Sequence, residues 1–213
     1  VTILLEYRSK FVEDYMVLLG YQSRIKFVQP DTVYCSNSMV IPPHSQCGVG
    51  IPEGLLLLRS RILRAINTTD CGNSTKILVI DRSLSQSRSI TNHAEMMARL
   101  SIEFPMWNFE SVQLEKMGIV DQIRQFSGAR GVIAPHGAGL SNILFLPPSS
   151  FIVEMFPKHY VVKCYMSLAK VLSLTYSGLI LSGNFDASSH LTLEEDELKA
   201  VIHLLKRHDF DSQ

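Results

Sequence analysis

Residues 130–157, RGVIAPHGAGLSNILFLPPSSFIVEMFP, decide the fold class of this chain. An apolar run at 132–134 ends in Pro135-His136-Gly137-Ala138-Gly139, and the segment that follows, 140–145, has helical spacing. A second apolar run begins at 151. Because glycines let a ligand approach the backbone and the first turn of a helix offers unpaired amides, this order of strand, glycine turn, helix and strand predicts an anion-binding turn.

The same alternation of apolar strands and helices extends over residues 73–182. Strands are expected at 77–80, 109–114, 131–134, 151–155 and 174–176, and helices at 92–102, 119–126, 140–145 and 163–172. This pattern is typical of a doubly wound parallel sheet with helices on both faces, in which ligands bind at the carboxyl ends of the strands. We therefore expect a Rossmann-like, nucleotide-binding α/β domain at 73–182.

The segments on either side of this domain have less regular patterns. Strands are expected at 1–5, 24–28, 32–35 and 39–41, and helices at 11–19 and 53–66, so we interpret 1–72 as the remainder of an N-terminal domain with an interdomain segment. Residues 183–213 predict an amphipathic packing helix and tail, with Thr192 as the helix cap. The chain begins with Val1 rather than methionine, and we expect it to be part of a longer protein.

Composition excludes some classes of partner. Of the 213 residues 46% are hydrophobic, which is ample for a core, and 20 Lys and Arg balance 20 Asp and Glu. No bulk charge attracts nucleic acid or an anionic membrane, so any anion site is local. No apolar run is long enough to span a bilayer, and membrane attachment is expected only through a segment absent from this sequence.

Cysteines and glycosylation sequons bear on the cellular compartment. The four cysteines form no CxxC pair and no zinc spacing, so no metal site is expected. Cys35 and Cys47 flank a Pro-rich loop and either close it as a disulfide or remain free thiols. Asn67 and Asn73 begin candidate N-glycosylation sequons, which favours the lumen of the secretory pathway.

Charged and polar residues follow several of the predicted strands. Arg82 and Arg88 lie in the loop after strand 77–80, where two guanidiniums clamp a diphosphate or simply remain solvated. His136 is either a structural histidine or a group that donates to a phosphate or acts as an acid toward a leaving group. Glu154 either forms an ion pair with a neighbouring helix or accepts ribose hydroxyls.

The glycine turn matches none of three known motifs in full: the dinucleotide fingerprint, the Walker A loop and the nucleophile elbow of α/β-hydrolases. Residues 137–142 read GxGxxN, which lacks the third glycine of the dinucleotide fingerprint, and no acid follows at the required distance. A dinucleotide-binding oxidoreductase domain therefore remains a weaker alternative. The chain has no Walker A ending and no GxSxG elbow, and the latter absence excludes an α/β-hydrolase.

Two blocks of sequence carry a resemblance to a known family. ILVIDRS…SRSITN and VDQIRQFSGARGVIAPHGAGLSNILFLPPSSFIVEMFP resemble the strand, Arg-rich loop and signature block of glycosyltransferase family 61, and the resemblance covers roughly residues 10–178. It implies a GT-B-like fold with two Rossmann-like domains, of which the N-terminal one is incomplete here. The residues that match the family's donor site, by resemblance, are Arg82, Arg88, Gln122, His136, Gly137, Ala138, Gly139, Asn142 and Glu154.

The resemblance also implies an activity. It is the inverting transfer of a sugar, xylose or N-acetylglucosamine, from a UDP-sugar to a hydroxyl of a glycan or glycoprotein in the Golgi or endoplasmic reticulum. The diphosphate is expected on the turn, with Arg82 and Arg88 neutralising its charge in place of a divalent metal, Glu154 receiving the ribose and His136 taking a catalytic role. No residue is identified as the general base. A non-catalytic UDP-binding remnant is the alternative.

Overall fold

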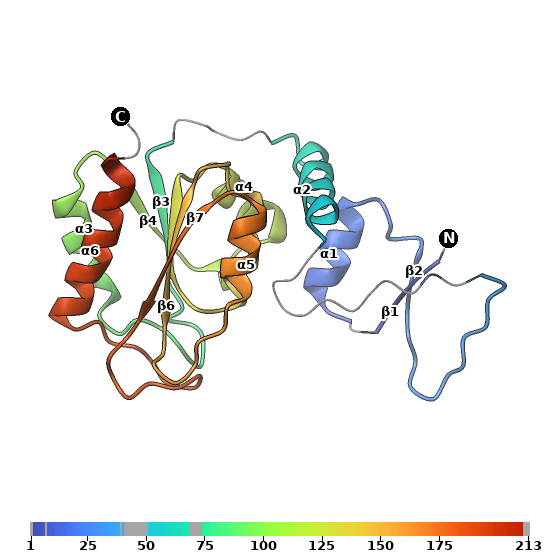
Figure 1. Ribbon diagram of the computed structural model, residues 1–213. Coiled ribbons are helices and arrows are strands. Elements are labelled where there is room, and N and C mark those ends of the chain that lie inside the picture. The colour runs from blue at the N-terminus through green and yellow to red at the C-terminus, as the bar shows by residue number, and fades with distance from the viewer. Residues whose placement is uncertain (1, 7, 39, 41–50, 69–73, 211–213) are drawn as a thin grey trace.

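The structure is a computed structural model that describes residues 2–6, 8–38, 40, 51–68 and 74–210. It contains a five-stranded parallel sheet between two layers of helices, and a two-stranded sheet near the N-terminus (Figure 1). The predicted strand at 39–41 includes residues 39 and 41, which lie outside the described residues.

The large sheet has the order β4-β3-β5-β6-β7, and every pair of neighbouring strands is parallel. Its strands are β3 (Lys76–Ile80), β4 (Asn108–Val112), β5 (Gly131–Pro135), β6 (Phe151–Phe156) and β7 (Thr175–Ile180). The chain moves outward from β3 to β4 and then returns to the other side of β3 to form β5. The order therefore reverses between β3 and β5, and such a switch point leaves a crevice at the carboxyl ends of the two strands.

Helices cover both faces of this sheet, as the doubly wound prediction requires (Figure 1). On one face lie α3 (His93–Glu103) and α6 (Glu195–Phe210), which pack on Ile77, Val79 and Ile133. On the other face lie α4 (Ile119–Ser127), the 3₁₀ helix η2 (Ala138–Phe145) and α5 (Cys164–Val171). Alternate strand residues, such as Leu78 and Val132, join this second core because successive side chains of a strand point to opposite faces.

The N-terminal part contains β1 (Ile3–Leu5), α1 (Lys10–Leu18) and β2 (Ile25–Phe27), with β1 and β2 parallel. The following helix, α2 (Pro52–Ala65), buries Ile62 and Leu63 in the same core as α4 and η2. Arg59 of α2 also donates from Nη2 to the Leu146 carbonyl at 2.9 Å. Packing thus extends across the predicted boundary at residue 72, and α6 packs on the sheet in the same way across the boundary at 183.

Several predicted elements are wrong or differ in detail. Residues 32–35 form no strand. The segment after the glycine turn is a 3₁₀ helix, because short apolar spacing does not distinguish i→i+3 from i→i+4 bonding. Strand β7 extends four residues further than predicted, to Ile180. Thr192 does not cap α6; its Oγ1 lies 2.6 Å from Thr91 Oγ1, and the helix begins at Glu195.

Candidate functional site at the switch point

The predicted site residues gather where the strand order reverses. Arg82 lies two residues after β3, and His136 directly follows β5. Since β3 and β5 are hydrogen-bonded neighbours, with Ile77 opposite Gly131, their carboxyl ends meet at the same edge of the sheet. The sequence could place each residue at a strand end, and the strand order brings the two ends together.

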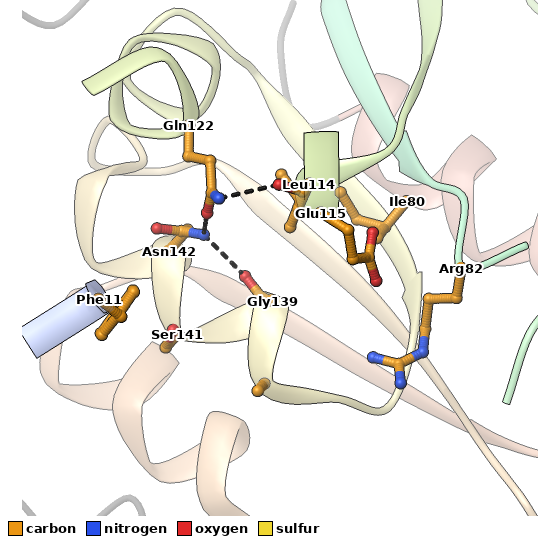
Figure 2. Close-up of a pocket in the computed structure, with 10 residues that line it drawn as sticks. Phe11, Ile80, Arg82, Leu114, Glu115, Gln122, Gly139, Ser141 and Asn142 are labelled. Carbon is orange, nitrogen blue, oxygen red and sulfur yellow. Dashed lines mark hydrogen bonds between the residues drawn. The ribbon is translucent and has the colours of Figure 1, made fainter. Parts of the chain in front are cut away.

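A cavity of about 330 Å³ opens beside this edge (Figure 2). It lies between the end of β3, the 3₁₀ turn η1 (Leu114–Lys116), α4 and η2, and α1 contributes one aromatic ring. Its lining residues are Phe11, Ile80, Arg82, Leu114, Glu115, Gln122, Ala138, Gly139, Ser141 and Asn142. Four of the predicted donor-site residues besides Arg82 therefore line it: Gln122, Ala138, Gly139 and Asn142.

The Arg82 side chain packs directly on the glycine turn. A Cβ at Gly137 would lie 2.1 Å from Arg82 Nη1 and 2.9 Å from its Cζ, so only glycine leaves room for the guanidinium in this position. The backbone of Gly137 is extended, with φ of 173°, and any residue adopts that conformation. The requirement for glycine is consequently a matter of space for Arg82, and the strand-to-helix turn and the Arg loop form one unit.

Arg88 lies over the ring of Tyr160, which also contacts His136. Its backbone has a left-handed φ of 57°, and its amide donates to the Ser189 carbonyl at 2.8 Å. Its guanidinium lies 5.4 Å from the centroid of the Tyr160 ring, and its Nε is buried without a hydrogen-bond partner. The loop geometry thus aims this side chain inward instead of leaving it solvated.

Neither Arg82 nor Arg88 has a carboxylate within salt-bridge distance among the described residues. Burial, followed by the positive charge of Arg88, lowers the pKa of Arg82, and the negative charge of Glu115 acts in the opposite direction. Two partly buried cations that repel each other without a counterion form a local positive site. Such a site is suited to a multiply charged anion.

Gln122 and Asn142 form an amide network on the opposite wall of the cavity (Figure 2). Gln122 Nε2 donates to the carbonyls of Leu114 and Met117, at 3.0 and 3.1 Å, which leaves its Oε1 to accept from Asn142 Nδ2 at 2.8 Å. Asn142 Nδ2 also donates to the Gly139 carbonyl at 3.2 Å. The network therefore ties the start of η2 to α4 and η1, and fixes the shape of the turn.

His136 belongs to a second, buried network at the ends of β5, β6 and β7. Its Nδ1 lies 2.5 Å from Glu154 Oε1, and Tyr176 OH donates to Glu154 Oε2 at 2.5 Å. The imidazole is enclosed by the rings of Phe156, Tyr160 and Tyr165, with centroids 5.3 to 5.5 Å away. Burial, followed by the hydrogen bond to Glu154, raises the pKa of the Tyr176 phenol, which therefore stays protonated.

The ribose-binding role expected of Glu154 stays a prediction, although the partners of this side chain do not favour it. The Glu154 side chain is 0% exposed, both of its oxygens are engaged, and it does not line the cavity. A ribose has no path to it without breaking the bonds to His136 and Tyr176. Sequence reasoning placed an acid at this strand end correctly, but it missed Tyr176, whose only signal is a position on the strand next to β6.

Other predicted features have mixed outcomes. Asn67 is exposed just after α2, and Asn73 lies outside the described residues. Of the two alternatives for Cys35, the structure shows the free thiol, which is exposed, whereas Cys164 is disulfide-bonded. Within the described part of the chain, no helix is long and apolar enough to cross a membrane. The same described residues contain no cluster of three His, Cys, Asp or Glu side chains arranged for a metal ion.

Three relatives and one solved structure are similar to this chain. Protein O-linked-mannose beta-1,4-N-acetylglucosaminyltransferase 2 of Xenopus tropicalis is 33% identical over 116 residues, which is 52% of this chain and 20% of the relative. The proteins of the same name from Canis lupus familiaris and Homo sapiens are 41% identical over 81 residues and 35% identical over 105 residues. These matches cover 38% and 47% of this chain, and 13% and 18% of the relatives.

The chain thus matches only 13% to 20% of the length of these relatives. A mutant flavo di-iron protein of Thermotoga maritima aligns with 73% of this chain and 40% of its own, at 14% identity and a TM-score of 0.42, which is too low to bear on function. The family described as Glycosyltransferase 61 matches residues 6–153. That match contains Arg82, Arg88, Gln122 and the whole glycine turn, and it ends one residue before Glu154. The chain therefore belongs to glycosyltransferase family 61.

Proposed function

We propose that this chain forms the donor-binding part of an inverting glycosyltransferase, which transfers a sugar from a UDP-sugar to a hydroxyl of a glycan or glycoprotein. The observation that carries the proposal is Arg82, which packs on the glycine turn, lines the 330 Å³ cavity and has its pKa lowered by burial and by the charge of Arg88. A diphosphate supplies the negatively charged partner that neither arginine has within salt-bridge distance among the described residues. Membership of the family supplies the class of donor.

In this proposal the two ends of the cavity have different tasks. Arg82, packed on Gly137, contacts the diphosphate, and the backbone of Ala138 and Gly139 approaches the same group. Phe11, Leu114 and the fixed Gln122–Asn142 amides lie toward the other wall and receive the nucleoside (Figure 2). Two cations at the leaving group stabilise the charge that develops as the bond to the sugar breaks, the task a divalent metal performs in other transferases.

The names of the relatives guide the choice of substrate. We propose N-acetylglucosamine as the first donor sugar to test, with xylose second, and an O-mannosyl peptide as the first acceptor. We also propose that the protein acts in the lumen of the secretory pathway, in the Golgi or endoplasmic reticulum. Sensitivity of the secreted chain to an N-glycosidase, lost in Asn67→Gln, would support that compartment.

Isothermal titration calorimetry of UDP against four proteins tests the proposal. The wild type should bind UDP in buffer containing EDTA, Arg82→Ala and Arg88→Ala should each bind at least tenfold more weakly, and Arg207→Ala should bind normally. Arg207 is an exposed arginine on α6, away from the switch point, and serves as the matched control. Unchanged UDP binding in both site variants contradicts the assignment, and a melting shift with NAD but not with UDP indicates an oxidoreductase domain instead.

A further inference from the structure

We propose that Tyr176, Glu154 and His136 form a hydrogen-bonded triad in which His136 Nε2 removes the proton of the acceptor hydroxyl. This assigns the general base that an inverting transfer requires, and it rests on the proposed function. His136 is then a catalytic residue, while Glu154 and Tyr176 are positioning residues that act through it.

The two hydrogen bonds of Glu154 each have a defined donor. Tyr176 keeps its phenolic proton, so it donates to Glu154 Oε2. The other oxygen, Oε1, faces His136 Nδ1 at 2.5 Å, and because a carboxylate oxygen only accepts hydrogen bonds, the hydrogen between them belongs to Nδ1. A neutral His136 that carries its hydrogen on Nδ1 has a lone pair on Nε2. That nitrogen is the base.

The Nε2 atom of His136 is accessible to solvent. No hydrogen bond of the described residues uses His136 Nε2, and it is not among the buried polar atoms that lack a partner, so it reaches solvent. The imidazole itself is otherwise enclosed, with 8% of its side chain exposed. One nitrogen is thus held in the protein interior and the other is presented at the edge of the sheet. A histidine that served only to fill the core would not need a buried carboxylate behind it.

His136 lies beyond the diphosphate along the proposed donor. His136 does not line the cavity that holds the nucleoside in the proposed function; it precedes the turn against which Arg82 packs. The diphosphate on Arg82 therefore lies between the nucleoside and His136, and the sugar, which follows the diphosphate, extends toward the His136 side. The titratable or charged groups around the imidazole are Glu154, Tyr176, Tyr160, Tyr165, Arg82 and Arg88.

The proposed step balances in atoms and charge. The hydroxyl proton moves to His136 Nε2 as the acceptor oxygen bonds to the anomeric carbon. The bond from that carbon to the β-phosphate oxygen breaks, and its electron pair leaves with UDP. The resulting imidazolium is stabilised by the Glu154 carboxylate, as in other histidine–carboxylate pairs, and it later releases its proton to solvent.

Long-range ¹H–¹⁵N NMR of the histidine rings tests the tautomer of His136 without any substrate. The resonances of His136 are identified by their absence in the variant His136→Gln. We expect a bare Nε2 and a protonated Nδ1 in the neutral ring. A neutral ring with its hydrogen on Nε2 overturns the proposal, because that nitrogen would then donate to a phosphate and accept nothing.

Kinetics with UDP-N-acetylglucosamine and an O-mannosyl peptide supply the second test. We expect kcat to fall on the order of 10³-fold in His136→Gln and Glu154→Gln, and to fall about tenfold in Tyr176→Phe. The affinity for UDP should stay within about threefold of wild type in all three variants. Equal losses of UDP affinity and kcat overturn the assignment of His136 as the base. Failure of the wild type to bind UDP instead refutes the proposed function, and the NMR result stands apart from it.

Discussion

The substitution Gly137→Ala separates the position of Arg82 from the stability of the fold. The backbone at Gly137 is extended, so alanine introduces no conformational strain there. Its Cβ, however, would lie 2.1 Å from Arg82 Nη1, and an ordinary contact begins near 3.4 Å. The guanidinium must therefore move by at least about 1.3 Å, which a long, half-buried side chain can do without unfolding its neighbours.

A displacement of this size lengthens a hydrogen bond of about 2.9 Å beyond the range in which it contributes. Hydrogen bonds to charged groups are worth about 1.5–3 kcal/mol, so we expect UDP to bind about 10- to 150-fold more weakly to Gly137→Ala. The midpoint of thermal unfolding should change by less than about 3 °C, since the free energy of unfolding is affected by under about 1 kcal/mol.

Two comparisons make the experiment decisive. Gly54→Ala in α2 is the matched control, because its new Cβ meets only Ile51 Cβ at 3.8 Å, and it should leave UDP binding unchanged. The double variant Arg82→Ala/Gly137→Ala should bind no more weakly than Arg82→Ala alone, because both changes remove the same contact. Full additivity of the two losses, or wild-type affinity in Gly137→Ala, would refute the packing of Arg82 on the turn as the basis of binding.

Other parts of the structure give further predictions. Phe126 in α4 is fully buried, so Phe126→Ala should lower the free energy of unfolding by about 3–5 kcal/mol. Urea denaturation measures this loss, and a smaller loss would mean that the side chains around α4 repack. Gln122→Ala removes the side-chain donor to the Leu114 and Met117 carbonyls and one of the two acceptors of Asn142 Nδ2. It should cost about 1–3 kcal/mol in the same assay, whereas the exposed Gln86→Ala should cost nothing measurable. Hydrogen bonds from Ser188 and Ser189 lower the pKa of Asp186 to about 2, so its contribution is present above pH 4 and is lost as pH falls toward 2; the stability difference between wild type and Asp186→Asn should disappear over that window. The same turn holds the Ser189 carbonyl that accepts from the Arg88 amide, so Asp186→Asn should weaken UDP binding severalfold at pH 7. Calorimetry measures this affinity, and an unchanged value would contradict the prediction.

Much of the sheet could be predicted from sequence because its strands are short, wholly apolar runs such as residues 77–80 and 131–134. The gathering of Arg82 and His136 also followed from general rules, since carboxyl ends of neighbouring parallel strands share one edge. The winding of η2 could not be predicted, because its apolar residues fit a 3₁₀ and an α-helix equally well.

The role of Glu154 could not be predicted for a different reason. Strand β6 is buried on both faces, so the pattern of apolar residues does not show which way its single acid points. Its partner is decided by the register between β6 and β7, which places Glu154 opposite Gly178 and close to Tyr176. The gap left by Gly178 and the phenol two residues earlier are properties of a strand pair, and they lie outside what a single segment of sequence contains.

The 3₁₀ winding of η2 also has a mechanical consequence. Eight residues rise about 16 Å in a 3₁₀ helix and about 12 Å in an α-helix, a difference of about 4 Å. Both ends of the segment are tethered, by the His136 amide to the Met155 carbonyl and by Arg59 to the Leu146 carbonyl. The helix η2 therefore fixes the distance between the glycine turn and the two prolines at 147–148. Because each residue of a 3₁₀ helix turns the chain by about 120°, removing one residue from η2 would shorten the helix and rotate Asn142 away from Gln122.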